Sequence, residues 1–572
     1  MPSVLFVNSG HRVPLGEGKT ILDAVRTAQL PLESPCGGLG VCGKCRVRLV
    51  REGQANPARN LVNMDKRRLV SAEDLEQGYV LACRALVTGD LELVLPGDQE
   101  AENQSLVILD RGESFDYALR PFITKRLEAA GACTAVYGGG ELLGREEGDT
   151  RGELYGIALD IGTTTLVAEL IDLRNGAVLA KDAMLNPQSA YAQDVLSRIH
   201  LAASREGGLD LLHQAFLEAF RQLLGNLSAS GGVEPRRIYE VVFSGNTTML
   251  HLATGTDPAP LGKYPYLSTI AGGEYRPAGE LGIAPFALVY LPPLVSAYVG
   301  ADICSGILVS RLDQKKGTTL FIDIGTNGEM VLAKDGRLSA TSTAAGPAFE
   351  GMNISCGMRA AKGAIEGFRI NDGTELLDCQ VIGGGPARGI CGSGLLDIVG
   401  ELARTGVVGK NGRFAKAEAL PPALAERLER RADEAVFVIS AEVSVSQKDI
   451  RQVQLAKGAI RAGLEALLDR IGTSAGDLDR VEIAGSFGYH LREESLFNIG
   501  LLPPGFRGKI RFTGNTSQSG AAAFLLNAEF RETMKDLAGR VEKVELADTG
   551  DFERRFVQSL QFPSPEGRSA AG

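Results

Sequence analysis

The pattern of hydrophobic and polar positions differs between the first hundred residues and the rest of the chain. Near the N-terminus, short β-prone runs at 4–7 and 46–50 lie on either side of a segment with helical periodicity. Thr20 is placed to cap this helix, which is predicted to run to about Gln29. Four residues form its apolar face: Ile21, Leu22, Ala24 and Val25. From Tyr155 almost to the C-terminus, β-rich and helical runs alternate, which is typical of an α/β fold.

Two segments of this α/β part repeat one another. The first is YGIALDIGTTTLVAELID at 155–172, and the second is TLFIDIGTNGEMVLAKDG at 319–336. Each has an apolar strand, a D-I-G-T-(T/N) turn and a second apolar strand, which predicts a β-hairpin. The repeat is 163 residues long, from Asp160 to Asp323 (323 − 160 = 163). We therefore expect duplicated halves that face a common cleft.

A polar stretch, GDQEAENQ at 97–104, separates the N-terminal region from the α/β part and is interpreted as a linker. A strand is predicted at 105–109 and a helix at 120–130. The chain is accordingly divided into four parts: an N-terminal domain at 1–96, a linker and small joining segment at 97–152, an α/β domain at 153–545 and a partly flexible C-terminal extension at 546–572.

Composition places the chain among ordinary globular proteins. Of its 572 residues, 44% are hydrophobic and 23% are charged, which excludes disordered and collagen-like classes, and the length favours several domains. The net charge is −10 without a basic block, so nucleic-acid binding is not expected. No run approaches roughly 18 unbroken apolar residues, and no secretory signal opens the chain. We expect a cytoplasmic protein that does not enter a membrane.

Four of the nine cysteines have the spacing C-x5-C-x2-C, followed by a fourth cysteine after 37 residues: Cys36, Cys42, Cys45 and Cys83. Disulfides are the weaker interpretation in a cytoplasmic protein. Three thiolates in one Gly-rich loop with a fourth that arrives alone favour a [2Fe-2S] cluster. Zinc remains the alternative, although zinc sites usually show two close pairs. The segment resembles the plant- and vertebrate-type ferredoxins, which implies a β-grasp fold and a one-electron carrier.

The two D-I-G-T turns have the residues that phosphate and magnesium handling requires. Glycine lets the backbone approach a phosphate, while N–H groups and threonine hydroxyls donate to its oxygens. An aspartate at a strand end can hold Mg²⁺ directly or through water. Two such turns on opposite sides of a cleft can clamp the phosphates of one nucleotide. Neither turn is a Walker A loop or a Rossmann fingerprint.

These turns resemble the actin-like ATPase superfamily, over about residues 153–540. The resemblance implies two RNase-H-like lobes with ATP and Mg²⁺ between them. The first phosphate loop then has Asp160, Gly162, Thr163 and Thr164. The second has Asp323, Gly325, Thr326 and Asn327. The adenosine motif is similar to VEIAGSFG at 481–488, with Gly485, Ser486 and Gly488 facing the adenosine.

Further segments resemble a narrower family, the reductive activators of corrinoid proteins. They are NTTMLHL at 246–252, GPAFEGMNISCGMRA at 346–360, GICGSGLLD at 389–397, SQKDIRQVQLAKGAI at 446–460 and GNTSQSGA at 514–521. The resemblance implies an ATP-dependent enzyme that returns Co(II) to Co(I) on a separate corrinoid protein of a methyltransferase system. It also implies a low-potential electron donor and a homodimer. The chain has no DxHxxG corrinoid-binding signature, so the partner is expected to bring the corrinoid.

Roles for individual carboxylates follow from these resemblances. Asp160 and Asp323 are expected to organise Mg²⁺ and the attacking water. Glu350, in the GPAFEG turn, is the candidate for orienting that water, with a structural capping role as the alternative. Glu329 is a further candidate. Asp302 precedes a predicted helix and is interpreted mainly as its N-cap.

Three other functions remain open at this point. A small-molecule kinase with an accessory ferredoxin domain would transfer phosphate to a soluble acceptor. A redox-sensing ATP-binding module would bind a partner in a way that depends on the redox state of its cluster, without catalysing a reaction. An activator of radical-type dehydratases would place a [4Fe-4S] cluster between subunits on cysteines of the ATPase domain. This last function is disfavoured, because the five remaining cysteines are isolated from one another in the sequence.

Overall fold

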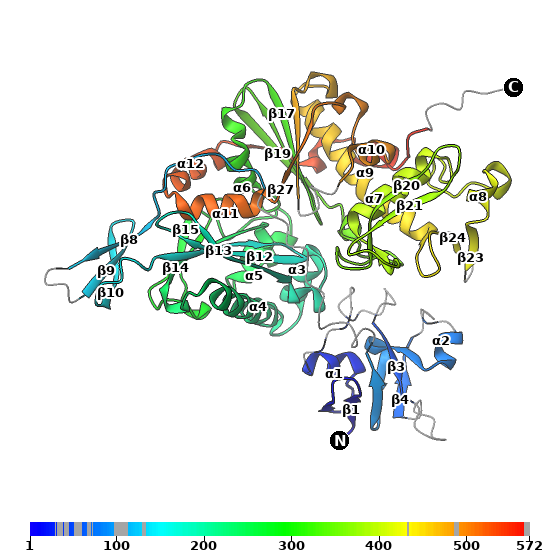
Figure 1. Cartoon of the computed structure of the whole chain (residues 1–572), viewed down its shortest axis with the longest axis horizontal. Coiled ribbons are helices and arrows are strands. Elements are labelled where there is room, and N and C mark those ends of the chain that lie inside the picture. The colour runs from blue at the N-terminus through cyan, green and yellow to red at the C-terminus, as the bar shows by residue number, and fades with distance from the viewer. Residues whose placement is uncertain are drawn as a thin grey trace. The chain divides into compact units, whose positions relative to one another are not determined.

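The computed structural model describes residues 1–28, 30, 32, 38, 45–50, 60–65, 70, 72–95, 112–128, 133–431, 434–485 and 491–564. The chain forms two compact units (Figure 1). The first consists of residues 1–105 and 185–216, and the second of residues 106–184 and 217–572. None of the helices in the described part of the chain combines the length and apolarity that crossing a bilayer requires.

The N-terminal part of the first unit is a five-stranded sheet packed against one helix. In spatial order the strands are β2 (His11–Pro14), β1 (Ser3–Phe6), β7 (Leu91–Val94), β3 (Arg46–Leu49) and β5 (Tyr79–Leu81). The central pair, β1 and β7, is parallel, and the outer pairs are antiparallel. This mixed sheet with one covering helix confirms the predicted β-grasp fold.

The helix of this fold, α1 (Ile21–Thr27), begins where the sequence predicts it. Thr20 accepts a hydrogen bond from the Asp23 backbone N–H, and the Asp23 carboxylate accepts one from the Thr20 N–H, which forms a capping box. The predicted apolar face is buried: Ile21, Leu22, Ala24 and Val25. The remaining elements of the unit are β4 (Leu61–Asn63), α2 (Ala72–Glu76), η2 (Ala82–Arg84), β6 (Ala85–Val87), η4 (Pro187–Ala190) and α3 (Val195–Ser204).

The helix predicted at 120–130 is wrong, because this region contains a strand. The second unit opens with a three-stranded antiparallel sheet in the order β10 (Glu141–Glu147), β9 (Cys133–Gly138) and β8 (Ile123–Leu127). Lys125 lies on the buried face of β8, where its ammonium donates to Glu146 and Tyr239 at 2.7 Å each. Because the charged Lys125 stands at an inward position, the sequence lacks the alternation of apolar and polar residues that predicts a strand. The strand predicted at 105–109 lies outside the described residues.

The sheets of the two halves of the α/β part share the order of five strands and differ in the position of the sixth. The first sheet has the order β13 (Val178–Leu185), β12 (Thr165–Asp172), β11 (Tyr155–Ile161), β14 (Ile238–Gly245), β16 (Leu288–Leu291) and β15 (Glu274–Pro277). The second has the order β19 (Arg337–Thr343), β18 (Gly328–Lys334), β17 (Thr318–Ile324), β26 (Arg480–Ala484) and β27 (Ile510–Gly514), with β28 (Glu542–Lys543) beyond β19.

The equivalent strands pair in the same way in both sheets. β11 is antiparallel to β12 and parallel to β14, and β17 is antiparallel to β18 and parallel to β26. Both predicted hairpins are therefore present, at equivalent places in two related lobes, as the internal repeat indicates. Because β11 and β17 are central, residues at their C-terminal ends reach the middle of each sheet edge, where ligands of open α/β sheets bind.

Helices and two small sheets complete the second unit. The helices are α4 (Gly208–Gly231, which the division between units cuts at residue 217), α5 (Thr247–Ala253), α6 (Ala301–Ser310), α7 (Gly392–Arg404), α8 (Pro422–Ala425), α9 (Gln447–Arg470), α10 (Glu493–Asn498), α11 (Thr516–Leu526), α12 (Glu529–Ala538) and α13 (Phe552–Ser559). The small sheets contain β20 (Ala364–Ile370), β21 (Leu377–Val381) and β22 (Gly389–Ile390), and β23 (Leu428–Arg431), β24 (Glu434–Val438) and β25 (Ser444–Ser446).

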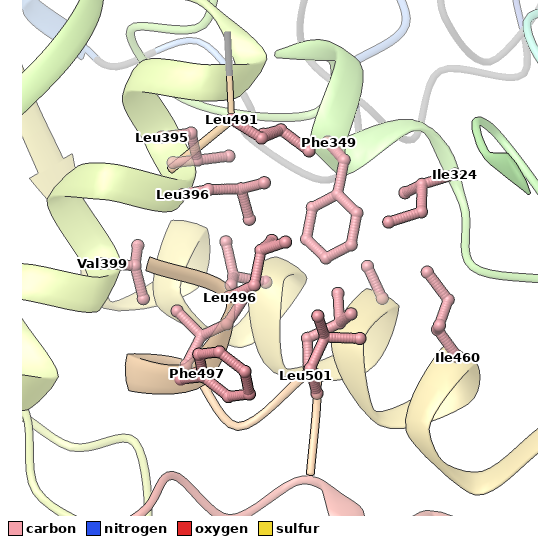
Figure 2. Packing of buried hydrophobic residues seen from close by; sticks show 14 of the residues in the cluster. Ile324, Phe349, Leu395, Leu396, Val399, Ile460, Leu491, Leu496, Phe497 and Leu501 are labelled. Carbon is pink, nitrogen blue, oxygen red and sulfur yellow. The ribbon is translucent and has the colours of Figure 1, made fainter. Parts of the chain in front are cut away.

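The hydrophobic core of the second lobe gathers around the turn that contains Glu350. Phe349, in the 3-10 turn η9 (Pro347–Glu350), is fully buried. Figure 2 shows its ring with Leu396 of α7 and Ile324 of β17 on either side. Packing of Phe349 therefore holds the backbone of the neighbouring Glu350 in place.

Replacing Phe349 with alanine is expected to lower the free energy of unfolding of this lobe by about 3–5 kcal/mol, the usual cost of deleting a fully buried aromatic ring. Denaturant unfolding followed by circular dichroism measures the change. Leu376→Ala is the matched control, because the Leu376 side chain is 63% exposed and its loss leaves no cavity. Equal unfolding midpoints for the two variants would contradict this packing.

Candidate functional site

The first D-I-G-T turn places Asp160 at the end of β11, against the start of α11. The Asp160 carboxylate accepts hydrogen bonds from Asn515 Nδ2 at 2.8 Å and from Ser517 Oγ at 2.7 Å. Gly162 makes the turn, since a Cβ there would lie 2.6 Å from the Thr165 carbonyl oxygen. Asp160 is thus held by two neutral donors, which leaves its negative charge uncompensated.

A chain of buried serine hydroxyls leads from Asp160 to β14 and α6. Ser517 Oγ, the donor to Asp160, lies 2.9 Å from Ser244 Oγ, which lies 2.9 Å from Ser305 Oγ. These residues come from α11, β14 and α6. Helices α6 and α11 approach closely because Gly520 has no side chain, and a Cβ there would lie 2.3 Å from Ser305 Cβ. Small residues therefore let both helices reach the site.

The second D-I-G-T turn places Asp323 at the end of β17. Within this turn the Gly325 N–H donates to the Asn327 carbonyl at 2.9 Å. Gly485, at the end of β26, has φ +124°, and a Cβ there would lie 2.5 Å from the Ile324 carbonyl oxygen and 3.3 Å from Asp323 Oδ1. Gly485 is thus next to the second turn. The other two expected adenosine residues, Ser486 and Gly488, lie outside the described residues.

Glu350 connects the two turns. Its carboxylate accepts hydrogen bonds from the hydroxyl of Thr164 in the first turn and from that of Thr326 in the second. Thr163, the other threonine of the first turn, accepts instead from Asn246 Nδ2 at 3.2 Å. The structure therefore brings Glu350 and both predicted phosphate turns to one place between the lobes of the second unit.

Asp302 belongs to the site, and its interpretation as a helix N-cap is wrong. The N-cap of α6 is Gly300, and Asp302 is the second residue of the helix. A Cβ at Gly300 would lie 2.6 Å from Asn246 Cα and 2.9 Å from Asp302 Oδ1. The missing side chain lets the start of α6 approach the start of α5, so that Asp302 lies close enough to Asp160 for their charges to interact.

Four carboxyl groups lie close together here, and the pKa of each is raised. Burial raises the pKa of Asp323 to about 8, and the charges of Asp302 and Asp160 add to the shift. Burial raises the pKa of Asp302 to about 7, with a contribution from Asp160. Burial raises the pKa of Glu329 well above its usual value, and the charges of Asp302 and Asp323 add to the shift. Burial also raises the pKa of Asp160, against the effect of its two hydrogen bonds. A cation bound among these groups would relieve their repulsion.

Mg²⁺ fits the chemistry of these donors. Among the described residues, no three histidine, cysteine, aspartate or glutamate side chains converge as a preformed metal site. Such a cage is not required, because Mg²⁺ in phosphoryl-transfer sites is usually held by one or two carboxylates together with phosphate oxygens and water.

The raised pKa values predict a pH-dependent stability. The folded protein holds the Asp323 proton up to about pH 8, whereas the unfolded chain releases it near the ordinary value of 3.8. Stability contributed by the protonated group is therefore lost as the pH rises through this window. Without nucleotide and with a chelator, the Tm of the wild-type protein is expected to fall between pH 6 and pH 8.5, and less steeply in Asp323→Asn. Equal slopes in thermal scans of the two proteins would contradict the prediction.

Two of the predicted cluster cysteines lie side by side in the first unit. Cys45 directly precedes β3 and Cys83 follows β5, and these strands pair with Arg46 opposite Leu81. The Ala82 N–H donates to the Cys45 carbonyl at 2.8 Å. Antiparallel pairing thus brings together two cysteines with 37 residues between them in the sequence, and both are buried. Cys36 and Cys42 lie outside the described residues.

The surroundings of these thiols fit a metal cluster. Gly38 has φ +96°, and a Cβ there would lie 3.1 Å from Leu22 Cδ2 and 3.9 Å from Cys83 Cβ. A glycine in the predicted ligand loop therefore lies against the fourth cysteine. Buried soft donors next to a close backbone turn are the environment that an iron–sulfur cluster requires.

Sequence reasoning missed the roles of Asn246 and Asn515. Each follows a strand in the triplet Gly-Asn-Thr, caps the next helix and donates to the first phosphate turn: Asn246 to Thr163 and Asn515 to Asp160. The triplet occurs at 245–247 and at 514–516. Its repetition is the signal that could have identified both residues.

Comparison with known proteins adds three family matches. Residues 5–88 match the family described as 2Fe-2S iron-sulfur cluster binding domain. Residues 155–315 match the RACo middle region, and residues 317–570 match the C-terminal domain of RACo, the ASKHA domain. The middle region contains the first lobe of the second unit together with the segment 185–216 of the first unit, and the ASKHA domain contains the second lobe.

Individual relatives extend over much or nearly all of the chain. The chain is 28% identical to the corrinoid activation enzyme RamQ of Eubacterium limosum, over 98% of this chain and 99% of the relative. It is 27% identical to the Co(II) methylated amine-specific corrinoid protein reductase of Methanosarcina barkeri, over 72% and 77%. Among solved structures, a reductive activator for corrinoid, iron-sulfur protein is 31% identical over 99% of both chains, with a TM-score of 0.72.

Proposed function

The chain belongs to the reductive activators of corrinoid proteins, and on this premise we propose how its residues divide the work. The protein transfers one electron to the Co(II) corrinoid of a partner protein and regenerates Co(I), in an ATP-dependent reaction. The observation that carries this function is the 31% identity over 99% of both chains to a reductive activator of known structure. The presence of buried cluster thiols and of two phosphate turns in one chain agrees with it.

We assign the electron-carrying role to the first unit. Cys36, Cys42, Cys45 and Cys83 would hold a [2Fe-2S] cluster, which supplies a one-electron carrier of low potential. The pairing of β3 with β5 fixes Cys45 and Cys83 in position before the cluster binds. Burial of both side chains excludes water from this side of the site.

We assign ATP binding and hydrolysis to the second unit. Asp160 and Asp323 would hold Mg²⁺, which neutralises the charge that develops on the phosphates. The other residues of the turns would grip the phosphates: Gly162, Thr163, Thr164, Gly325, Thr326 and Asn327. Gly485, Ser486 and Gly488 would face the adenosine. Asp302 joins the aspartates as a further carboxylate beside the phosphates.

Glu350 is proposed to orient the attacking water and to report the nucleotide state to both lobes. Its carboxylate bonds Thr164 of one lobe and Thr326 of the other. Phosphate oxygens that took these hydroxyl donors would release Glu350 toward the water. ATP can drive an unfavourable electron transfer only if nucleotide states differ in their affinity for states of the partner. A carboxylate shared between the lobes is a suitable place for that difference to arise.

We further propose a low-potential electron donor, a homodimer and a cytoplasmic location. The division into a ferredoxin-like domain at 1–96, a joining segment at 97–152, an ATPase domain at 153–545 and a C-terminal extension at 546–572 is proposed with them. The separate family matches at 5–88 and 155–315 are compatible with a division between these domains.

The function is tested by following cobalt and phosphate together under anaerobic conditions. With a low-potential reductant, Mg-ATP and a Co(II) corrinoid protein, the Co(II) paramagnetic resonance signal is expected to disappear while ³¹P resonance shows inorganic phosphate. Transfer of the γ-phosphate to a small metabolite, with the Co(II) signal unchanged, would support the kinase alternative. Redox-dependent binding of a partner without either change would support the sensing module.

A further inference from the structure

Arg26, on α1, lies beside the proposed cluster site. Helix α1 packs against η2, the turn that contains Cys83. A Cβ at Gly38 would lie 3.8 Å from Arg26 Nη2 and 3.9 Å from Cys83 Cβ. The guanidinium therefore reaches the place where the ligand loop and the fourth cysteine meet.

The same side chain contacts a distant segment of the first unit. Arg26 Cζ lies 5.7 Å from the centre of the Tyr191 ring, which is within the range of a cation–π interaction. Tyr191 and Arg205 both belong to the segment at 185–216. They line, together with Lys19, Asp23 and Arg26, a cavity of about 350 Å³. The guanidinium thus has the Tyr191 ring on one side, and the Arg26 side chain lines this cavity.

The electrostatics of this position matter for an electron carrier. Burial lowers the pKa of Arg26 and Arg205 lowers it further, whereas Asp23 and Cys83 raise it. Arginine nevertheless stays charged at neutral pH. Reduction of a cluster adds one negative charge, which a nearby buried cation stabilises more than an exposed one would. Local charge is one of the factors that set the potential of an iron–sulfur cluster.

We propose that Arg26 raises the reduction potential of the cluster and that Tyr191 is the residue that positions its guanidinium. The proposal rests on the function given above, because it requires the cluster. It makes the potential sensitive to the segment at 185–216: any change that moves Tyr191 alters the distance between the positive charge and the cluster. Redox state and the packing of this segment are then linked in both directions.

The test measures the midpoint potential of the full-length protein by redox titration with paramagnetic resonance of the reduced cluster. Arg26→Gln is expected to reduce the equilibrium constant of reduction about tenfold, a shift of about 59 mV to lower potential. Arg26→Lys, which keeps the charge, is expected to restore most of the difference. Arg12→Gln is the control, because it removes an exposed positive charge from the same domain.

Tyr191→Leu separates positioning from direct electrostatics. It is expected to shift the potential in the same direction as Arg26→Gln, by a smaller factor, and to add nothing in the double variant. A wild-type potential in Arg26→Gln would overturn the proposal, as would equal effects of Tyr191→Leu with and without Arg26. Absence of a [2Fe-2S] signal from the wild-type protein would instead overturn the proposed function together with this inference.

Discussion

Replacing Cys45 with serine is expected to abolish Co(I) formation while ATP hydrolysis continues close to the wild-type rate. Cys45 is 1% exposed and lies where the start of β3 meets the turn that contains Cys83. A serine hydroxyl at neutral pH is a far weaker ligand for iron than a thiolate. The cluster is therefore lost or converted. The residues proposed to bind ATP are all in the second unit, so the change leaves them intact.

The measurement combines visible absorption of the cluster, phosphate release and the Co(I) absorption band. Cys133→Ser is the control, because the Cys133 thiol donates to Glu128 and a serine hydroxyl can make the same bond. If Cys45→Ser disturbs folding of the domain, Cys83→Ser tests the same ligand set from η2, the turn after β5. Full cluster absorption and normal Co(I) formation in both variants would contradict the assignment.

Replacing Asp160 with asparagine is expected to reduce ATP hydrolysis by about 10²–10³-fold, a loss typical of removing one preorganised electrostatic group from a site. The substitution keeps the shape of the side chain. Its oxygen can still accept from Asn515, and its amide can donate to Ser517, whose hydroxyl also accepts. What disappears is the negative charge near the proposed Mg²⁺. Cluster absorption is expected to stay unchanged, whereas ATP-dependent Co(I) formation falls with hydrolysis.

Steady-state phosphate release and nucleotide binding measure this effect. Asp335→Asn is the matched control, because Asp335 is exposed in the turn between β18 and β19 and has φ +49°, a conformation that asparagine tolerates. Wild-type hydrolysis in Asp160→Asn would contradict the proposed role of the first turn. Equal losses in both variants would show that any lost carboxylate has the same effect.

Local signals in the sequence were enough to predict the fold where they agreed with the tertiary environment. Thr20 and Asp23 form the capping box expected before an apolar helical face. The two D-I-G-T turns are hairpins at equivalent places because the strands before them are apolar on both faces, as a central strand requires. Strand β8 was missed because Lys125 is buried among polar partners that come from β10 and β14.

Of the residues in the candidate site, only those at the ends of recognisable strands could be predicted from the sequence. Asp160 and Asp323 meet that condition. Asp302 does not, because its place depends on the close approach of α6 and α5 that Gly300 permits. The bond of Glu350 to Thr164, 186 residues away, depends on how the two lobes face each other, and the bond to Thr326, 24 residues away, depends on how two turns of the second lobe pack. No local pattern contains that information.

Dependence of Co(I) formation on both ATP and the cluster is measured in a single experiment. The protein is reduced under anaerobic conditions, freed of excess reductant and mixed with a Co(II) corrinoid protein, and the Co(I) absorption band is followed with and without Mg-ATP. The Co(I) band is expected to grow only with Mg-ATP and to be absent in Cys45→Ser. A band of equal size without ATP, or no band with any corrinoid protein while ATP is consumed, would contradict this expectation.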